Sequence, residues 1–308
     1  MLFCYTSPML IPSFPEFTPL TFELKDAMHP KLYQAVDGVS EFTFAGLYMF
    51  RKRYGYRVSR LEDKTFILSG IQPPHADGDV EKRFFSTPLA APGRGVLEEL
   101  FKTHDYWKNI PESIIIPEKE RLEEWGIEIS EDRDNFDYLY LRSDLAELPG
   151  KRYHKKRNLV AQFLKSYAHE EKPLTPELIS YAKEILERWR ENKGNESDYI
   201  ASMEALEHFG ELNMSGLLFY IDDKPAGWCL GEPVAGGRIF AIHFEKGLEE
   251  YKGIYQYINQ TFAASLPESI IHINREQDLG DEGLRQAKMT YRPSGFVRKY
   301  TGYSAGKQ

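Results

Sequence analysis

Short apolar runs broken by turn residues predict the elements of the first part of the chain. Residues 54–60 and 64–71 predict two strands separated by an acidic turn, which is typical of a hairpin. Residues 42–50 are apolar and aromatic, and this pattern fits either a helix or a strand. Residues 1–20 predict an irregular arm, and residues 72–81 predict a loop.

The next segment predicts a strand, a Pro-Gly-Arg-Gly turn and a helix from about Val96. The isoleucines of residues 113–116 predict a short buried strand. Pro117 then suits the first turn of a helix, where its missing N–H costs no hydrogen bond. Strands are expected again at residues 127–129 and 136–141.

The second half begins with three predicted helices. A basic helix is expected over about residues 151–167, and Pro173 ends it. A Thr-Pro pair then begins a helix over about residues 175–191, because Thr is a good N-cap and Pro a good first helical residue. Residues 198–209 predict the third helix.

The remaining pattern predicts a sheet with two further helices. The runs GLLFYI and AGWCLG flank the turn at residues 222–225, and RIFAIHF predicts a longer strand. A glycine turn then leads into an amphipathic helix. SIIHIN predicts a buried strand, residues 280–288 a helix and GFVRKYTGY a last strand.

The order of these elements repeats, although the residues do not. Both halves run through hairpin, strand, glycine turn, helix, buried strand, helix and strand. We therefore expect two α/β modules of one architecture, residues 1–135 and 136–308, with the boundary between about 135 and 150.

Composition narrows the class of protein. The 308 residues, of which 42% are hydrophobic, suffice for two ordinary domains. A net charge of −8 disfavours a general nucleic-acid binder and predicts no DNA partner, so contact with RNA or anionic lipid would need a local basic patch.

Cysteine usage and hydropathy bear on the compartment. Cys4 and Cys229 form no disulfide framework and no metal cluster, which fits a reducing compartment. No apolar run reaches the ~20 residues of a membrane helix, and the N-terminal segment has no basic region like that of a signal peptide. We expect a cytoplasmic protein with no integral membrane segment.

Two glycine turns stand where predicted helices begin. Free backbone N–H groups and the helix dipole at such turns suit a phosphate or pyrophosphate. Neither turn is a GxGxxG motif or a P-loop, and a purely structural turn is the alternative. The candidate cofactor-binding residues are Gly93, Gly95, Lys252 and Gly253.

The string KRYHKKRN at residues 151–158 places five Lys or Arg residues and one His within eight positions of an acidic chain. Helical residues three or four apart share a face, which would group Lys151, His154, Lys155 and Asn158. This face is either simply solvated or a clamp for a phosphate-rich substrate such as coenzyme A, a tRNA end or an anionic headgroup. The candidate substrate-binding residues here are His154, Lys155, Arg157 and Asn158.

A third polar group follows the predicted strand SIIHIN. A carboxylate of Glu276 or Asp278 could accept a proton from an attacking amine or hydroxyl, and Arg275 or Lys288 could stabilise an oxyanion. Helix capping by Asp278 and a surface position for Lys288 are the structural alternatives. The candidate residues are Asn274, Arg275, Glu276, Asp278, Lys288 and Tyr291.

Other catalytic patterns do not occur in the sequence, which has neither a GxSxG elbow nor an HExxH motif. His243 and His272 lie on predicted strands, and we interpret them as satisfied core residues.

Two segments, YLRSDLAELPGKRYHKKRNLVAQF and INREQDLGDEGLRQAKMTYRP, resemble signatures of soluble bacterial proteins related to the C-terminal domain of phosphatidylglycerol lysyltransferase. The likeness spans about residues 40–303. It implies two tandem GNAT folds, each a mixed, mostly antiparallel sheet flanked by helices, similar to the peptidoglycan-bridge aminoacyltransferases. In such sheets two central strands splay apart and substrate occupies the gap, which places the segment after SIIHIN at the site.

The resemblance also implies a reaction. An acyl or aminoacyl group would pass from aminoacyl-tRNA or a coenzyme A thioester to an amine or hydroxyl by direct attack, with no tightly bound cofactor and no metal. The acceptor would be a lipid or a small amine. Carried over by motif, the residues to test first are Arg157, Asn158, Arg275, Asp278 and Lys288.

Two other functions stay open. A non-catalytic ligand-binding protein that retains the scaffold is the main alternative, because the glycine turns match the acetyl-coenzyme A loop of active acetyltransferases poorly. An RNA-binding module that uses the basic helix is the third.

Overall fold

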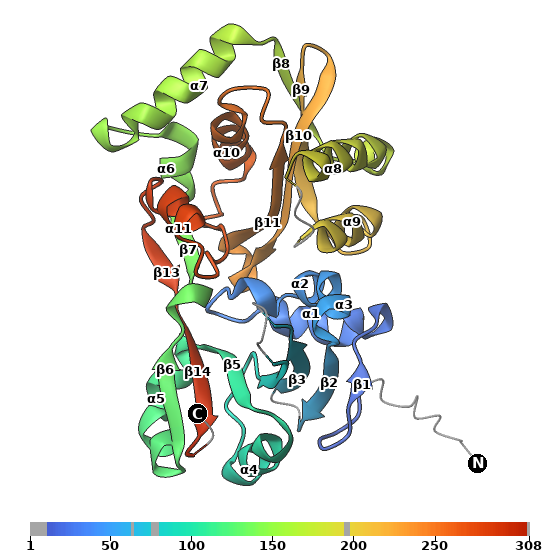
Figure 1. Ribbon diagram of the computed structural model, residues 1–308, viewed down its shortest axis with the longest axis vertical. Coiled ribbons are helices and arrows are strands. Elements are labelled where there is room, and N and C mark those ends of the chain that lie inside the picture. The colour runs from blue at the N-terminus through green and yellow to red at the C-terminus, as the bar shows by residue number, and fades with distance from the viewer. Residues whose placement is uncertain (1–10, 63–64, 75–79, 194–197, 307–308) are drawn as a thin grey trace, which may run out of the picture. The chain divides into compact units, whose positions relative to one another are not determined.

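The computed structural model describes residues 11–62, 65–74, 80–193 and 198–306. Internal contacts divide the chain into two units: unit 1 comprises the residues up to Asn135 and those from Arg298 on, and unit 2 comprises Phe136–Val297. Each unit is built on a seven-stranded sheet (Figure 1). The expected class, two α/β modules each with a mixed sheet and flanking helices, is confirmed.

In unit 1 the strand order is β1-β2-β3-β4-β5-β14-β6, and only β4 and β5 run parallel. The strands are β1 (Thr18–Pro19), β2 (Arg57–Leu61), β3 (Thr65–Gln72), β4 (Lys82–Ser86), β5 (Tyr106–Pro111), β6 (Ile127–Glu131) and β14 (Lys299–Ser304). The helices are α1 (Lys25–Tyr33), α2 (Phe44–Met49), α3 (Arg51–Tyr54), α4 (Arg94–Thr103) and α5 (Glu112–Glu124).

The predicted hairpin is confirmed as β2 and β3, and the ambiguous residues 42–50 form mainly helix α2. The strand predicted at residues 113–116 is wrong, because α5 already begins at Glu112. Ile114 and Ile115 pack into the core while Ile116 is 73% exposed. The buried strand of this region is β5, which the prediction missed because its polar Lys108 interrupts the apolar pattern.

In unit 2 the order is β13-β7-β12-β11-β10-β9-β8, and only β11 and β12 run parallel. The strands are β7 (Asp137–Leu141), β8 (His169–Pro173), β9 (Ser215–Ile221), β10 (Lys224–Val234), β11 (Ile239–Gly247), β12 (His272–Asn274) and β13 (Gly295–Val297). The helices are α6 (Arg142–Glu147), α7 (His154–Ser166), α8 (Ile179–Lys193), α9 (Tyr199–Glu207), α10 (Ile254–Ser265) and α11 (Glu282–Met289). The three predicted helices at the start of this half are confirmed as α7, α8 and α9.

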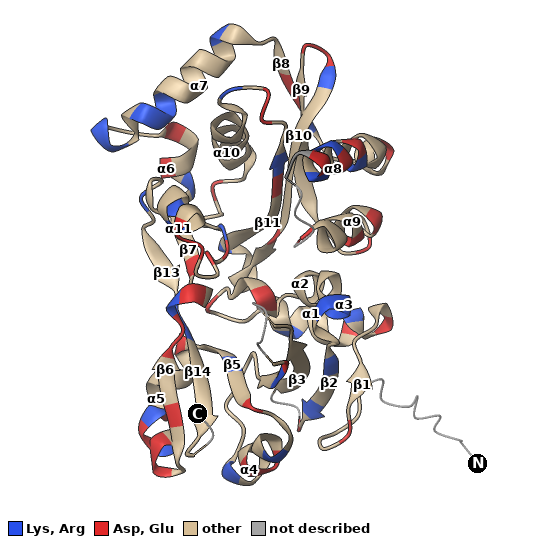
Figure 2. Ribbon diagram, in the orientation of Figure 1, with Lys and Arg blue, Asp and Glu red and all other residues tan. Residues whose placement is uncertain are grey.

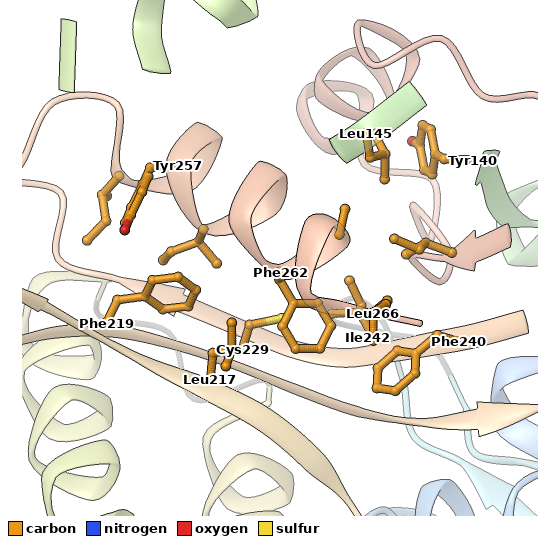
Figure 3. Packing of buried hydrophobic residues seen from close by; sticks show 14 of the residues in the cluster. Tyr140, Leu145, Leu217, Phe219, Cys229, Phe240, Ile242, Tyr257, Phe262 and Leu266 are labelled. Carbon is orange, nitrogen blue, oxygen red and sulfur yellow. The ribbon is translucent and has the colours of Figure 1, made fainter. Parts of the chain in front are cut away.

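Helix α10 covers the middle of this sheet. Figure 3 shows Phe262 of α10 against Cys229 and Phe240 of the neighbouring strands. At the α7 side, the rings of Phe163 and Tyr257 stack with centroids 4.5 Å apart. This core fixes β10, β11 and α10 with respect to one another, and β11 carries part of the site described below.

The chain returns from unit 2 to unit 1 for its last strand. Strand β7 follows β6 in the chain but pairs with β12 and β13 of unit 2, whereas β14 follows β13 but pairs with β5 and β6 of unit 1. The single last strand expected at GFVRKYTGY is therefore wrong, because it divides at Arg298 between two sheets. Residues 298–306 group with unit 1 by their contacts.

The sheet of unit 2 opens next to its parallel strand pair. Strands β11 and β12 pair only where residues 239–241 face residues 272–274. Beyond Ala241, β11 continues to Gly247, whereas β12 ends at Asn274. The polar segment after β12 thus begins at this opening, as the resemblance implies.

Candidate active site

The loop from Arg275 to Asp281 joins β12 to α11 and is held by Asn274. The buried Asn274 amide donates to an Asp137 carboxylate oxygen at 2.9 Å, and its carbonyl oxygen accepts the Glu276 backbone N–H at 2.8 Å. Glu276 has φ 55°, a left-handed conformation that side chains other than Gly seldom adopt. Such strain persists where the surroundings over-determine it, so the loop fixes Glu276 at the opening.

Asp278 is fully buried and accepts at least four hydrogen bonds. They come from the Tyr138 hydroxyl at 2.5 Å, Arg285 Nε at 3.0 Å, Arg285 Nη2 at 2.7 Å and the Gly280 N–H at 2.9 Å. Burial alone would raise its pKa, but Arg285 and Tyr138 hold the pKa well below its usual range. Both carboxylate oxygens are occupied, so Asp278 is a poor proton acceptor and ties α11 to the loop.

Lys288 reaches back from α11 to the same loop. Its ammonium donates to the backbone carbonyls of Arg275 and Glu276, the latter at 3.2 Å, and lies 5.6 Å from the Tyr138 ring centre. Burial lowers the pKa of Lys288 to about 8, and the nearby Arg275 charge acts in the same direction. Lys288 can therefore change its charge near neutral pH, unlike an ordinary surface lysine.

Arg275 spans the opening toward β11. Its Nη2 lies 3.3 and 3.2 Å from the two carboxylate oxygens of Glu245, and its guanidinium lies 5.1 Å from the centre of the Tyr291 ring. Burial opposes the charge, but Glu245 keeps the pKa of Arg275 above its ordinary value. Burial likewise raises the pKa of Tyr291 to about 12. Arg275 is thus a permanent cation beside Lys288.

The basic helix contributes one residue that the sequence analysis did not select. Lys156 Nζ lies 3.9 Å from the centre of the Tyr291 ring, and within the described residues no carboxylate lies within 4.0 Å of it. Burial and the charge of Arg275 lower the pKa of Lys156 to about 8. Two cations therefore lie against the Tyr291 ring, Arg275 from the opening and Lys156 from α7.

The residues that the sequence predicted for substrate binding on the basic helix make other contacts than those at Tyr291. His154, Lys155 and Asn158 are exposed, and the one contact between them is a 3.4 Å approach of Asn158 to His154. Arg157 donates to the carbonyls of Leu148 and Gly150, so it closes the turn before α7. Their substrate-binding role stays a prediction.

His243 of β11 is buried and satisfied, as expected, but its partners are two carboxylates. Nε2 lies 3.1 Å from Glu232 and Nδ1 lies 2.8 Å from Glu276. Burial would lower the pKa of His243, yet the two carboxylates raise it to about 10. The ring is an imidazolium that donates from both nitrogens, and it holds the Glu276 side chain in one orientation.

This arrangement leaves one side of Glu276 open. Its Oε1 is taken by His243, and in the described part of the chain no second hydrogen bond reaches the carboxylate. A quarter of the side chain, 25%, is exposed. Glu276 is therefore an oriented carboxylate with an accessible oxygen, on the loop whose backbone carbonyls accept hydrogen bonds from the Lys288 ammonium.

The glycine turns occupy two different units. Gly253, with φ 92°, precedes α10, and a Cβ there would lie 2.9 Å from the Leu159 carbonyl oxygen, so close packing on α7 requires glycine. Lys252 beside it is exposed. Gly93 and Gly95 lie at the start of α4 in unit 1, where an added Cβ would meet no atom within 4 Å. A donor-binding role for these turns stays a prediction.

Two further properties concern the described residues as a set. No helix among them is both long and apolar enough to cross a lipid bilayer. Nor do they contain a group of three or more His, Cys, Asp or Glu side chains placed to hold a metal ion.

Two mixed sheets, each opening beside its one parallel strand pair, define a tandem GNAT-like protein. Residues 34–303 match the family described as "Phosphatidylglycerol lysyltransferase, C-terminal", and the chain belongs to that family. The resemblance seen in the sequence is thereby confirmed.

Solved structures agree with this fold. A conserved protein of unknown function from Bacteroides thetaiotaomicron VPI-5482 is 27% identical, with a TM-score of 0.82 over 94% of this chain and 99% of its own. FemX is 9% identical, with a TM-score of 0.56 over 95% and 98% of the two chains. L-PGS from Bacillus licheniformis is 12% identical, with a TM-score of 0.55 over 85% and 92%.

One relative among curated proteins is similar in sequence. It is an uncharacterised protein of Mycoplasmoides gallisepticum, 25% identical over 179 residues. The match covers 56% of this chain and 56% of that protein, so the chain spans about half the length of this relative.

Proposed function

We propose that the opening of unit 2 transfers an aminoacyl or acyl group from a carrier to an amine or hydroxyl. One observation carries the proposal: the loop after β12 presents the accessible oxygen of Glu276, and the half-buried ammonium of Lys288 on α11 donates to two backbone carbonyls of that same loop. A base and a cation held together are what acyl transfer needs at the attacking atom and at the carbonyl oxygen. The rigid loop holds both in place before substrate binds.

The reaction is a direct attack without a covalent enzyme intermediate. The acceptor nitrogen or oxygen forms a bond to the donor carbonyl carbon, and Glu276 takes the proton that the acceptor loses. Lys288, in its charged form, stabilises the oxyanion of the tetrahedral intermediate, with Arg275 adding positive potential. The intermediate collapses by breaking the carbonyl bond to the carrier, whose oxygen or sulfur receives the proton from Glu276.

For the donor we favour aminoacyl-tRNA over a coenzyme A thioester. The family name describes a lysyltransferase, and Lys and Arg gather at the start of α7, where they can approach a phosphate backbone (Figure 2). A lipid headgroup or a small amine is the proposed acceptor. Lys156 and Tyr291 then line the donor side, where a cation beside a ring suits the terminal nucleotide.

The test is a transfer assay with tRNA charged with radiolabelled amino acids and, as acceptors, vesicles containing phosphatidylglycerol or a mixture of small amines. Glu276→Gln and Lys288→Met are expected to lower transfer by about 100-fold or more, the range found for a general base or an oxyanion donor. Lys165→Met, an exposed lysine on α7, is the matched control and should keep full activity.

The pH dependence gives an independent readout. Because the Lys288 pKa is lowered to about 8, its charge and hence transfer should fall as pH rises through that value. Lys288→Arg does not titrate in this range and should remove that limb. Full transfer by both Glu276→Gln and Lys288→Met would refute the assignment, and donor binding without turnover would favour a non-catalytic binding protein.

A further inference from the structure

A continuous row of aromatic rings lies on one face of the unit 1 sheet. We call it the ring row; neighbouring centroids are 5.4 to 6.1 Å apart. Its members are Tyr54, Tyr56, Phe84, Tyr106 and Tyr303. Phe84 and Tyr106 face each other across β4 and β5, so their side chains share one face, and the core residues Phe85 and Trp107 occupy the other.

The ring row is not wholly buried. Tyr54, Tyr56 and Tyr303 are half-buried, so part of the row reaches solvent, whereas Phe84 and Tyr106 form its buried centre. Tyrosine rings that stay partly exposed beside a buried aromatic centre offer stacking area to a ligand.

A lysine stands over this row. Lys108 follows Tyr106 by two residues on β5 and shares its face, and its Nζ lies 5.3 Å from the Tyr54 centroid and 4.9 Å from that of Phe84. Its one hydrogen bond goes to the neutral Gln72 Oε1 at 2.5 Å. Within the described ranges no carboxylate forms an ion pair with Lys108. Burial lowers the pKa of Lys108 to about 8, although the charges of Glu41 and Asp132 act in the opposite direction.

Lys108 has the same position in the sheet of unit 1 as Arg275 has in the sheet of unit 2. In both sheets the parallel pair ends, at Trp107 in β5 and at Asn274 in β12. The next residue is a cation, and the one after it is left-handed, with φ 54° at Asn109 and 55° at Glu276. The same backbone thus carries Lys108-Asn109 at one opening and Arg275-Glu276 at the other. Unit 1 has the cation but an amide in place of the candidate base.

We propose that the ring row and Lys108 form a second ligand site, which binds a phosphate ester carried on a flat or apolar body. The phosphate supplies the anionic partner that Lys108 lacks among the described residues, and the rings supply the stacking surface. Helix α3, with the sequence RKRY, adds positive potential beside Tyr54 (Figure 2). With an amide at the base position, the site binds and does not transfer. It does not depend on the reaction proposed for unit 2.

The experiment is calorimetric titration of the full chain with adenosine monophosphate, which has a flat body, and with decyl phosphate, which has an apolar one. Lys108→Met keeps the length of the side chain over the rings and removes the charge. We expect it to weaken binding of the preferred ester about ten-fold or more, the effect of one charge-assisted contact. Lys119→Met on the exposed face of α5 is the matched control and should bind as the parent does.

A melting temperature and a second variant exclude misfolding as the cause of weaker binding. Removing an unpaired half-buried charge should not lower the melting temperature, and Tyr54→Leu should weaken binding while leaving Lys108 in place. If only adenosine monophosphate binds tightly, the ligand of this site has a flat body. If only decyl phosphate does, the ligand has an apolar body. Equal binding by Lys108→Met and the parent, loss of binding in Lys288→Met alone, or no binding of either ester at millimolar concentration would each overturn the proposal.

Discussion

At the residue scale, the central feature is an imidazolium held between two carboxylates. His243 carries a proton that two glutamates stabilise, and only one of these, Glu276, reaches the opening. Glu232 is 3% exposed and serves the ring alone. The ring therefore acts on the reaction through Glu276, as a positioning residue, by fixing the orientation of that carboxylate.

The first prediction concerns His243→Gln. Two carboxylates would lose a buried cationic partner, and we expect a loss of about 3 kcal/mol in the free energy of unfolding at pH 6, near the lower end for a broken buried pair. The folded pKa of about 10 lies above the unfolded value near 6.5, so this stabilisation is complete below pH 6.5 and disappears as pH rises through 10. Denaturant titrations at pH 6 and pH 10 measure the difference.

His272→Gln provides the control for that measurement. His272 is half-buried on β12, and burial lowers its pKa, so this substitution should give no loss that grows toward low pH. A stability difference for His243→Gln that stayed constant across this range would contradict the protonated ring. Transfer activity of His243→Gln should also fall, because the Glu276 carboxylate is no longer held in one orientation.

Some of the site residues could be selected from the sequence, and the role of others could not. Arg275, Glu276 and Lys288 were selected because they follow a buried strand, and the fold brings them together. His243 was visible only as a histidine on a strand. Its role depends on Glu232, eleven positions away, and on Glu276, thirty-three positions away, and no spacing pattern links these residues.

At the scale of elements, the phase of α7 decides which basic residue reaches the site. Tyr153, Lys156, Val160 and Phe163 follow the three- and four-residue spacing of one helical face, and all four are buried or half-buried. The prediction grouped the opposite face, with His154 and Lys155, because it followed charge. Following the apolar stripe instead would have identified Lys156 from the sequence alone.

Helix α11 depends on Asp278 for its position. We expect Asp278→Asn to cost about 3 kcal/mol of unfolding free energy, because an amide cannot accept all of the hydrogen bonds that Arg285, Tyr138 and Gly280 donate. The lowered pKa makes this stabilisation present above pH 4 and lost as pH falls. Urea titrations at pH 7 and pH 3 would measure it.

Asp281→Asn is the matched substitution for Asp278→Asn. Asp281 caps α11 by accepting the Leu284 N–H at 2.7 Å, and asparagine caps as well as aspartate does, so stability should change little. If Asp278→Asn abolished transfer while leaving stability unchanged, Asp278 would be a base and not an anchor.

Two local errors of prediction have the same physical origin. Residues 113–116 are β-branched and apolar, which favours a strand, yet α5 buries two of these isoleucines and turns the third outward. Strand β8 is almost entirely polar and exposed, because it is the edge of its sheet, and it gave no apolar signal. In both places tertiary context overrides local preference.

At the scale of the whole molecule, the last strand of the sequence, β14, belongs to the sheet of unit 1. The order of elements in the sequence does predict two similar modules. It does not reveal this return of β14, because β13 and β14 are separated only by Arg298 and share one apolar pattern. The pairing is decided by partners more than 150 residues away, such as Glu131 opposite Tyr300.

Because β14 belongs to the sheet of unit 1, a deletion of this last strand should affect the two units differently. Deleting residues 298–308 removes β14 from between β5 and β6 and also removes Lys299, which is fully buried and paired with Glu41. Unit 2 keeps all seven of its strands, because β13 ends at Val297. We expect backbone amides of unit 1 to lose hydrogen-exchange protection while those of unit 2 retain it, as mapped by mass spectrometry. A shorter deletion of residues 306–308 spares β14 and should leave both units protected, whereas equal loss in both units after the longer deletion would show that they fold as one.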